Sequence, residues 1–450
     1  MRNVLVIAYY FPPLGLSGVQ RTLKFIKYLP SFGWKPTVLT VEPRAYFAHD
    51  ATLMEDLDSL GIDVIRTRSI DPLHVFRKKG TVPMPNEATY KLLTVLNQAV
   101  FIPDSKVGWK RYAVRKGTEL LREGSFQAIF ATAPPYTDFL IARDLKKHFN
   151  IPLVLDYRDA WLANPLHRYI TPFHHMMHRR LEDSVLREAD AVVTINRTIK
   201  ELILTRYRRL TYNDITIIPQ GYDANDFARV APRTSRRMRI TYAGTFYHNR
   251  TPRYMIEAFR RFLDRVPGAA EKSELCFVGQ FRDENLSLLR KHRLEKNVVV
   301  TGYLPHKDAV AYLAGSDVLW MMLGGDKGDE MISTGKLFEY LGARKPILGC
   351  VPPGEARTII EESGAGFITD PADVDAITKT LEHLFSLYQR NALPAPGEDF
   401  VQQYERKALT GHLAYLLSNL LSIGDEIAGA VQTAPPAARN EDPVTGSAGN

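Results

Sequence analysis

The stretch Ser333-Thr334-Gly335-Lys336-Leu337-Phe338-Glu339-Tyr340-Leu341 predicts a short helix that begins at a ligand site. Ser333 or Thr334 can cap this helix, and the glycine that follows lets a ligand approach the backbone closely. The amides of the first turn are unpaired and carry partial positive charge, which suits a phosphate. Lys336 and Glu339 are three residues apart, so a helix places both on one face. This arrangement suits a nucleoside diphosphate, although a capped surface helix with an ordinary Lys–Glu pair explains these residues about as well.

Apolar runs of strand length lie on both sides of this stretch, at 318–321 and 346–349. The start of the chain shows the same alternation, because the apolar run 4–10, a glycine turn, the helical pattern 19–29 and the run 37–41 follow one another. Strand, turn, helix and strand form a βαβ unit, which predicts a parallel sheet. The further strands are predicted at 64–66, 128–131, 153–156, 191–194, 215–218, 238–244, 275–278, 298–301 and 366–368.

The pattern is lost between 224 and 237, and we place a domain junction there. The sequence therefore predicts an α/β protein of two doubly wound, Rossmann-like domains that face a cleft. The first domain spans 1–225 and is completed by a helix at about 400–422, and the second spans 238–395. A helix is expected at 373–388, and the tail 424–450 lacks apolar periodicity, so we expect it to be disordered.

Composition favours a cytoplasmic protein. The chain has 450 residues, 45% of them hydrophobic and 24% charged, which is ordinary for a globular protein with two cores. Its two cysteines, Cys276 and Cys350, lie in apolar runs and are expected to be buried thiols in a reducing compartment. The apolar run near the N-terminus is too short for a signal peptide, and no run of 18 apolar residues exists to span a membrane.

The formal net charge is +8. Basic clusters occur at 77–79, 179–180, 206–209 and 233–239, without a repeated aromatic–basic pattern, so nucleic acid is not expected as a partner. Anionic substrates and an anionic membrane surface fit these clusters better, and a basic surface without a partner fits equally well.

Several blocks of the sequence resemble, in family order, the retaining glycosyltransferases of family 4, and in particular the bacterial subgroup that transfers sugars in exopolysaccharide synthesis. The resemblance extends from about Met1 to about Leu421. The blocks are 10–13 with Gly15 and 18–21, 156–161, 218–223 with Phe227, 242–246, 301–305 and 336–341. The resemblance implies the GT-B fold, with a nucleotide-diphosphate sugar on the C-terminal domain and the acceptor on the N-terminal domain.

On the donor side, the resemblance assigns Glu339 to the ribose hydroxyls. The family's first acid falls at position 331, which is Met331 here, so either Glu330 replaces it through a shifted loop or that carboxylate is missing. Diphosphate charge is assigned to Arg250, with Arg253 as the second choice, and to Lys336. The donor-binding residues expected in full are Gly18, Gly244, Arg250, Gly302, Thr334, Gly335, Lys336, Leu337 and Glu339.

On the acceptor side, the resemblance points to the block that follows the strand 153–156. Arg158 and Asp159 lie where they could contact an acceptor or handle a proton, and a salt bridge that braces the cleft wall is an equal alternative. The acceptor-binding residues expected in full are Gly15, Tyr136, Asp156, Arg158 and Asp159, and the catalytic residues are Arg158, Asp159, Arg250 and Lys336.

No metal or cofactor is expected, because no aspartate-pair metal motif is evident and protein cations can neutralise the leaving diphosphate. His174 and His178 are spaced like metal ligands but lack the intervening glutamate of metalloproteases, so a surface helix or the rim of the acceptor site is favoured.

The resemblance thus implies a hexosyl-type glycosyltransferase that acts with retention. Its acceptor is expected to be a saccharide or a lipid-linked saccharide of bacterial surface polysaccharide synthesis, at the inner face of the plasma membrane. Two alternatives stay open: a nucleotide-sugar epimerase of the same fold, and a binding protein whose donor site has decayed.

Overall fold

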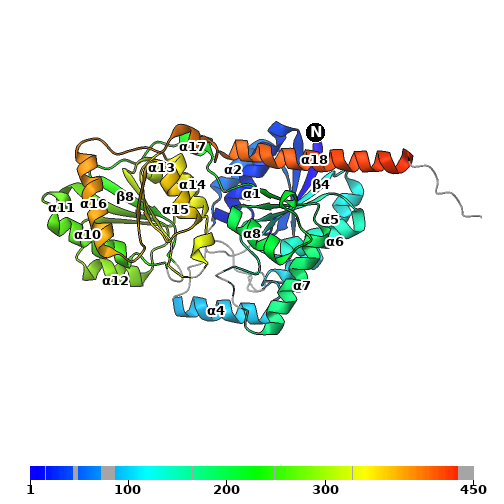
Figure 1. Ribbon diagram of the computed structural model, residues 1–450, viewed down its shortest axis with the longest axis horizontal. Coiled ribbons are helices and arrows are strands. Elements are labelled where there is room, and N and C mark those ends of the chain that lie inside the picture. Colours follow the sequence, from blue (N-terminus) through cyan, green and yellow to red (C-terminus); the bar gives the residue numbers. More distant parts are fainter. Residues whose placement is uncertain are drawn as a thin grey trace, which may run out of the picture.

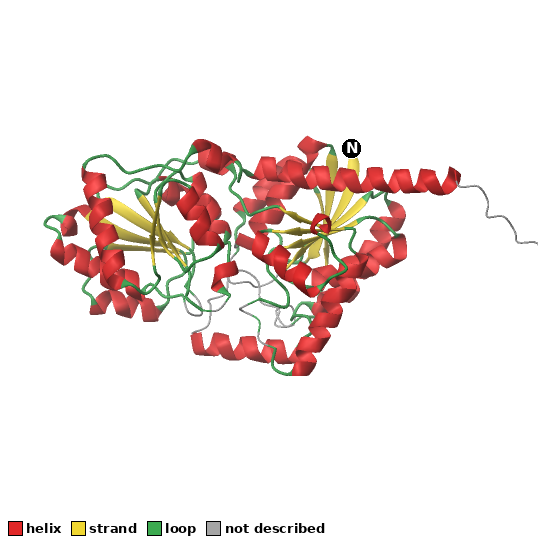
Figure 2. Cartoon of the chain, viewed as in Figure 1, coloured by secondary structure: helices red, strands yellow, loops and turns green. Residues whose placement is uncertain are grey.

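The computed structural model describes residues 1–15, 17–43, 49–71, 87–164, 167, 169–246, 250–326 and 328–433. It contains two parallel sheets that lie side by side, each covered by helices on both faces (Figures 1 and 2). The first sheet has seven strands in the order β3-β2-β1-β4-β5-β6-β7, and the second has six in the order β10-β9-β8-β11-β12-β13. In both, the chain starts at an inner strand and builds outward to each side, which is the doubly wound arrangement.

Every strand predicted from an apolar run is present, with ends that differ by a few residues. The strands of the first sheet are β1 Arg2–Ile7, β2 Trp34–Val41, β3 Asp63–Thr67, β4 Ala128–Ala133, β5 Leu153–Tyr157, β6 Ala191–Thr194 and β7 Ile215–Ile217. Those of the second sheet are β8 Met238–Ala243, β9 Ser273–Val278, β10 Val298–Gly302, β11 Val318–Met322, β12 Ile347–Cys350 and β13 Gly366–Thr369.

The helices alternate with the strands as the βαβ pattern requires. Those before the second sheet are α1 Ser17–Tyr28, α2 Thr52–Leu60, α4 Glu87–Val100, α5 Lys110–Glu123, α6 Thr137–Phe149, α7 Pro172–Glu188, α8 Arg197–Arg206 and α9 Ala224–Ala228. Those that follow are α10 Arg253–Arg265, α11 Ala269–Lys272, α12 Asp283–Lys291, α13 His306–Ala314, α14 Gly335–Gly342, α15 Glu355–Glu362, α16 Val374–Gln389, α17 Glu398–Gln402 and α18 Arg406–Thr433. Short 3-10 turns occur at Leu29–Phe32, Val107–Trp109, Tyr212–Asp214 and Asp329–Met331.

Both faces of each sheet are buried, because parallel strands joined by crossover helices are covered on both sides. The central strands β1, β4 and β5 carry almost only apolar residues, and their side chains divide between two core clusters on opposite faces of the first sheet. The second sheet has the same two-sided core. Cys276 and Cys350 are buried, unpaired thiols in β9 and β12, as expected.

The helix predicted over 400–421 is wrong in its bounds. The chain forms α17, leaves the helix, and starts α18 at Arg406, because the backbone here bonds to Tyr222 instead of to itself: the amide of Tyr222 donates to the Tyr404 carbonyl and the amide of Arg406 donates to the Tyr222 carbonyl. α18 then continues to Thr433, so part of the segment expected to be disordered from 424 is helical. Residues 434–450 lie outside the described part.

The last helix returns to the first sheet. Leu409, Leu413 and Leu417 of α18 share a core cluster with Leu23 and Ile26 of α1. In Figure 1, α18 accordingly crosses the top of the first α/β unit. The first sheet ends at β7 and the second begins at Met238, while the domain limits at 225 and 238 stay a prediction.

A buried ion pair connects α1 to the middle of the first sheet. The Arg21 guanidinium donates to both carboxylate oxygens of Asp156, at 2.8 and 3.0 Å, and neither side chain is exposed. Arg21 also donates to the carbonyls of Ile218 and Pro219, and Thr132 donates its hydroxyl to Asp156. All the charge in this pair is therefore balanced within the protein.

We predict that Asp156→Ala destabilises the protein strongly, because it leaves Arg21 charged, buried and without its carboxylate. Removal of one partner of a buried pair costs about 3 to 5 kcal/mol, whereas an exposed pair contributes about 0 to 1 kcal/mol. Glu201→Ala, which breaks the exposed pair of Arg197 and Glu201, is the matched control. Chemical denaturation followed by circular dichroism measures both. Equal losses for the two variants would contradict this account of the pair.

Candidate active site

A cavity of about 290 Å³ lies where the carboxyl ends of the two sheets face each other. Ligands of doubly wound proteins bind at this edge of the sheet. Gly15 and Asp50 contribute to its wall from the first half of the chain, and most of the wall comes from the second half. The residues predicted for donor or acceptor that line this cavity are Gly15, Gly244, Arg250, Thr334, Lys336 and Glu339.

Helix α14 points its first turn at this cavity, as its sequence suggested. Thr334 is the N-cap residue, with an extended backbone and no hydrogen bond from its side chain to the helix. The hydroxyls of Ser333 and Thr334 are buried and have no hydrogen-bond partner among the described residues. Two hydroxyls and the unpaired amides of the first turn are thus available to an anion.

Lys336 extends from this turn over Tyr242 at the end of β8. Its Nζ donates to the Tyr242 hydroxyl at 2.8 Å and lies 4.3 Å from the ring centroid. Gly244 has a positive φ of 135°, and a Cβ there would lie 2.7 Å from Lys336 Nζ, so the lysine position requires a glycine. Desolvation by the surrounding protein and then the neighbouring Arg250 lower the pKa of Lys336 to about 7.

Arg250 is buried in the wall of the same cavity, so two cations share it. Their mutual repulsion, seen in the lowered pKa of Lys336, leaves the site ready for negative charge. Arg253, the second choice from sequence, is exposed at the first position of α10 and does not line the cavity.

Glu339 lies one turn further along α14 and is paired with a histidine that the sequence reasoning missed. Its Oε1 is 2.9 Å from His306 Nε2. Burial lowers the pKa of His306, but Glu339 and Asp226 outweigh this effect and raise it. Burial likewise raises the pKa of Glu339, and His306 outweighs it, so that the pKa is lowered. Each member of the pair thus favours the charged form of the other.

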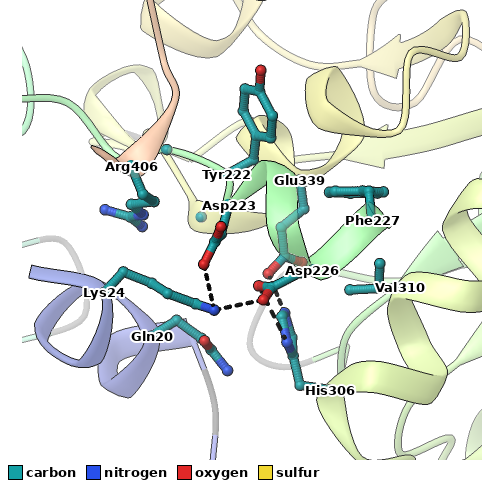
Figure 3. Close-up of a pocket in the computed structure, with 12 residues that line it drawn as sticks. Gln20, Lys24, Tyr222, Asp223, Asp226, Phe227, His306, Val310, Glu339 and Arg406 are labelled. Carbon is teal, nitrogen blue, oxygen red and sulfur yellow. Dashed lines mark hydrogen bonds and ion pairs between the residues drawn. The ribbon is translucent and has the colours of Figure 1, made fainter. Parts of the chain in front are cut away.

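His306 is also the point where the two halves of the chain meet. Its backbone amide donates to Asp50 Oδ2 at 2.7 Å, so a carboxylate of the first half caps helix α13 of the second. Its Nδ1 lies 3.8 Å from Asp226 Oδ2, and Asp226 accepts from Lys24 at 2.6 Å (Figure 3). Sequence gave no signal for these contacts, because their partners are far apart along the chain.

A second, smaller pocket of about 20 Å³ (Figure 3) shares Gln20, His306 and Glu339 with the first. Gln20 Oε1 and Arg406 Nη1 both border it and are buried without a partner in the described part of the chain. A volume of this size holds about one water molecule.

Arg158 is in the loop after β5, but its guanidinium is held by backbone carbonyls. Nη1 donates to the Gly18 carbonyl at 2.5 Å, and Nη2 donates to the Pro134 carbonyl. A Cβ at Gly18 would lie 2.5 Å from Nη1, so this glycine accommodates Arg158 and does not line the cavity. The structure therefore favours the bracing alternative for Arg158, although its partners are carbonyls and not a carboxylate.

Asp159, the next residue, is accessible to solvent, yet desolvation by the surrounding protein raises the pKa of its carboxyl to about 6, against the opposing charges of Arg158 and Arg250. Asp156 and Tyr136, by contrast, are enclosed. Asp156 is bound by Arg21, and the Tyr136 hydroxyl donates to the Ala160 carbonyl at 3.0 Å while its ring stacks on Trp161. These two side chains shape the loop and do not reach the cavity.

The remaining predicted residues are placed as follows. Leu337 is fully buried in the core cluster beneath α14, so its side chain does not face a donor. Gly302 forms a turn with a φ of 73°, and its neighbour Tyr303 lines the cavity in its place. Gly335 borders the smaller pocket.

Glu330 does not take the place of the first acid that the family resemblance puts at position 331. Glu330 is exposed, and its Oε2 accepts from the amide of Gly328 within its own turn, at 2.6 Å. Met331 occupies the expected position, and its carbonyl accepts from the side chain of Asn196 at 2.9 Å. Glu330 does not line either of the two pockets described above.

The histidines whose spacing resembles that of metal ligands, His174 and His178, belong to α7. His178 is buried and accepts from Trp161 Nε1 at 3.0 Å, so it lies inside the fold and not on the surface as expected. Within the described residues, no three His, Cys, Asp or Glu side chains are grouped closely enough to hold a metal ion. No helix in that part of the chain is long and apolar enough to span a bilayer.

The two parallel α/β units face a cleft that contains a helix N-terminus, two cations and a carboxylate. This is the GT-B arrangement of a nucleotide-sugar-dependent glycosyltransferase. Residues 18–221 match the family described as glycosyl transferase 4-like domain, and residues 237–386 match the family described as glycosyl transferases group 1. The chain belongs to these family 4 glycosyltransferases, whose members act with retention. No curated protein matches the chain.

Solved structures of the same fold come from several organisms. HepE of Anabaena, solved in complex with UDP, has a TM-score of 0.55 at 13% identity and covers 96% of this chain and 100% of its own. Sucrose-phosphate synthase of Thermosynechococcus elongatus has a TM-score of 0.60 at 13% identity, over 94% of this chain and 100% of its own. A protein assigned as a UDP-N-acetylglucosamine 2-epimerase from Listeria monocytogenes has a TM-score of 0.57 at 14% identity, over 94% of this chain and 97% of its own.

We predict that His306 makes the stability of the unliganded protein depend on pH. The folded pKa of His306 is raised, so the stabilisation by its ion pair is fully present below the ordinary pKa of about 6.5 and is lost as pH rises through the folded value. His306→Gln should therefore lower the melting temperature clearly at pH 6 and little at pH 9. Each kcal/mol lost corresponds to about 2 to 4 °C for a domain of this size.

Melting curves between pH 5.5 and 9 measure this dependence. His383→Gln, at an exposed position of α16, is the control and should leave the profile unchanged. If His306→Gln lowers the melting temperature equally at both ends of the range, the ion pair with Glu339 is not the cause.

Proposed function

We propose that this glycosyltransferase takes a hexosyl group from a UDP-sugar and transfers it to a saccharide or lipid-linked saccharide acceptor of bacterial surface polysaccharide synthesis. The observation that carries the donor half of the proposal is the first turn of α14. Thr334, whose buried hydroxyl has no partner among the described residues, lines one cavity together with Lys336 and Glu339. UDP is the proposed nucleotide because HepE, which has the same fold, was solved with UDP and with UDP-glucose.

In this proposal Glu339 accepts hydrogen bonds from the ribose hydroxyls. One of its oxygens is engaged by His306, so the ribose either uses the other oxygen or displaces the histidine. The diphosphate lies against the α14 amides, Lys336 and Arg250. Negative charge grows on the diphosphate as the glycosidic bond breaks, and donors fixed in place before the reaction stabilise that charge most effectively. These protein cations are the reason that we expect transfer to need no metal.

On the acceptor side, Asp159 is the proposed contact for the attacking hydroxyl. It is exposed in the loop after β5, and desolvation raises its pKa to about 6, while the charges of Arg158 and of Arg250 in the donor half oppose this shift. Arg158 then acts as a positioning residue, because it holds this loop against the start of α1. Gly15 lines the same cavity without a side chain that would obstruct an acceptor.

The lipid-linked acceptor and a place at the inner face of the plasma membrane are part of the proposal. They are supported by the net charge of +8 and by exposed basic residues such as Arg179 and Arg180 on α7. The cluster at 77–79 lies outside the described residues. Scattered basic residues without interleaved aromatics do not suit nucleic acid, so we propose none as a partner.

An epimerase of the same fold is the second candidate, because the Listeria protein has the same fold over nearly its whole length. A binding protein with a decayed donor site is the third, because no acid stands at position 331. The three functions differ in the products that they form from the same substrate.

Incubation of the purified chain with UDP-sugars and saccharide acceptors tests the proposal, with products separated by mass spectrometry and resolved by NMR. We expect release of UDP together with a new glycoside that retains the donor's anomeric configuration. Glu339→Ala should weaken UDP binding at least tenfold, because a hydrogen bond to a charged group contributes about 1.5 to 3 kcal/mol. An epimerised sugar nucleotide would establish the second candidate, and UDP-sugar binding without turnover would establish the third.

The second prediction for this site is that UDP binding takes up a proton at Lys336. With a pKa of about 7, Lys336 is mostly neutral at pH 8 in the empty site, and a bound diphosphate raises its pKa and charges it. Calorimetry at pH 8 in two buffers of different ionisation enthalpy should show uptake that approaches one proton per UDP. Lys336→Met should abolish this uptake. Heats that are independent of the buffer in the wild-type protein would exclude Lys336 as the diphosphate cation.

A further inference from the structure

The large apolar side chains that remain exposed are concentrated in one region of the first half of the chain. On α4, Leu92 is 60% exposed, Leu96 52% and Val100 69%, and Leu93 is also exposed. Near the start of α7, Phe173 is 57% exposed and Met176 is exposed as well. We define the α4–α7 edge as Leu92, Leu93, Leu96, Val100, Phe173 and Met176.

Leu92, Leu96 and Val100 form one stripe, because a spacing of four places them on the same side of a helix, and Leu93 lies beside this stripe three residues before Leu96. A helix in contact with a core normally turns this stripe inward, and here it faces solvent. His174 Nε2 lies 3.1 Å from the carbonyl of Ala99, so the end of α4 is fixed to the start of α7. Figure 1 shows the two helices joined at the bottom of the first unit, opposite α18.

Positive charge borders this apolar surface. Arg179 and Arg180 follow Met176 by three and four residues on α7, are exposed, and form no ion pair within the described part of the chain. An apolar helix face next to unpaired arginines is the combination that binds at the surface of an anionic membrane, where the apolar side sinks into the boundary between headgroups and acyl chains.

We propose that the α4–α7 edge docks the enzyme on an anionic lipid bilayer, with α4 lying in the plane of the interface. At 14 residues α4 is about 21 Å long, which is too short to span a bilayer and sufficient to lie on one. A second copy of the chain is a poorer occupant, because a two-fold contact brings the same surface of both copies together and so tends to bring the unpaired arginines near each other.

Docking at this edge rests on the proposed function, because it would present a lipid-linked acceptor to the cleft. The acceptor loop is connected to α7 by short contacts. Trp161, two residues after Asp159, donates its Nε1 to His178 of α7 at 3.0 Å, and its carbonyl accepts from Tyr169 at 3.0 Å. A bilayer that holds the start of α7 thereby holds the loop that carries Asp159 at a fixed height above the lipid.

The test is co-sedimentation of the full chain with phosphatidylcholine vesicles, with and without phosphatidylglycerol, at low and high salt. We expect binding only with phosphatidylglycerol, weakened by salt. Leu92→Asp/Leu96→Asp should reduce binding at least tenfold, and Leu60→Asp/Tyr415→Asp, at exposed positions elsewhere, should not. Arg179→Gln/Arg180→Gln should reduce binding roughly twentyfold, from a factor of about five for each arginine. Arg290→Gln/Lys291→Gln, an equal charge change on α12, should have little effect.

Insertion is measured separately by quenching with brominated lipid. The four native tryptophans are all among the fully buried side chains, so a tryptophan introduced at the surface is the one that lipid can reach. Fluorescence of Leu96→Trp should be quenched in anionic vesicles, and that of Tyr415→Trp should not. This measurement does not depend on the folding of the double aspartate variant.

No binding of the wild-type chain to anionic vesicles at low salt, or quenching that is equal at both tryptophan positions, would overturn the proposal. A wild-type dimer that Leu92→Asp/Leu96→Asp converts to a monomer would assign the edge to a second copy instead. Thermal stabilisation by UDP is recorded for every variant. Loss of the stabilisation by UDP with vesicle binding intact would refute the donor site alone. Stabilisation by UDP without vesicle binding would refute the docking alone.

Discussion

The structure depends on the polar face of α1, which binds the segment where the chain leaves the first sheet. Arg21 pairs with Asp156 and donates to the carbonyls of Ile218 and Pro219. One turn further on, Lys24 binds Asp223 and Asp226, and then Tyr28 donates to Asp223 at 2.6 Å. Buried charges are costly unless each has a partner, and here the cations and carboxylates compensate one another. These ion pairs hold the segment that leaves the first sheet in one path, and so make the carboxyl ends of the two sheets face each other.

The same set of charges continues into the donor cavity. Asp226 lies between Lys24 and His306, and His306 binds Glu339. His306 and Glu339 both belong to the second half, so the carboxylate assigned to the donor ribose is one step removed from the contact between the halves. A ligand that takes Glu339 from His306 changes the surroundings of the histidine that Asp50 and Asp226 of the first half contact. A coupling of this kind between ligand binding and the contact of the halves would act equally in both directions.

The sequence was sufficient for the strands, because each is a short apolar run bounded by glycine or polar residues and needs both faces buried. It was also sufficient to bring Lys336, Glu339, Gly244 and Arg250 together in one cavity, since the order of the βαβ units places their loops at one edge. It did not find His306, whose partners Asp50, Asp226 and Glu339 come from three distant segments. The end of α17 was missed for the same reason, because the chain leaves the helix there to bond with Tyr222.

The block Asp156-Tyr157-Arg158-Asp159 shows why a motif alone cannot distinguish a ligand contact from a support. Successive side chains of an extended segment point to opposite sides, so neighbours in this block have different surroundings. Asp156 and Arg158 turn into the protein, where Arg21 and the carbonyls of Gly18 and Pro134 satisfy them, and Asp159 is left exposed. These two supports fix the backbone just before Asp159, the acidic side chain of this block that is exposed. Since Trp161 also joins this loop to α7, the position of that acid is set by the same helix that carries the exposed apolar and basic surface.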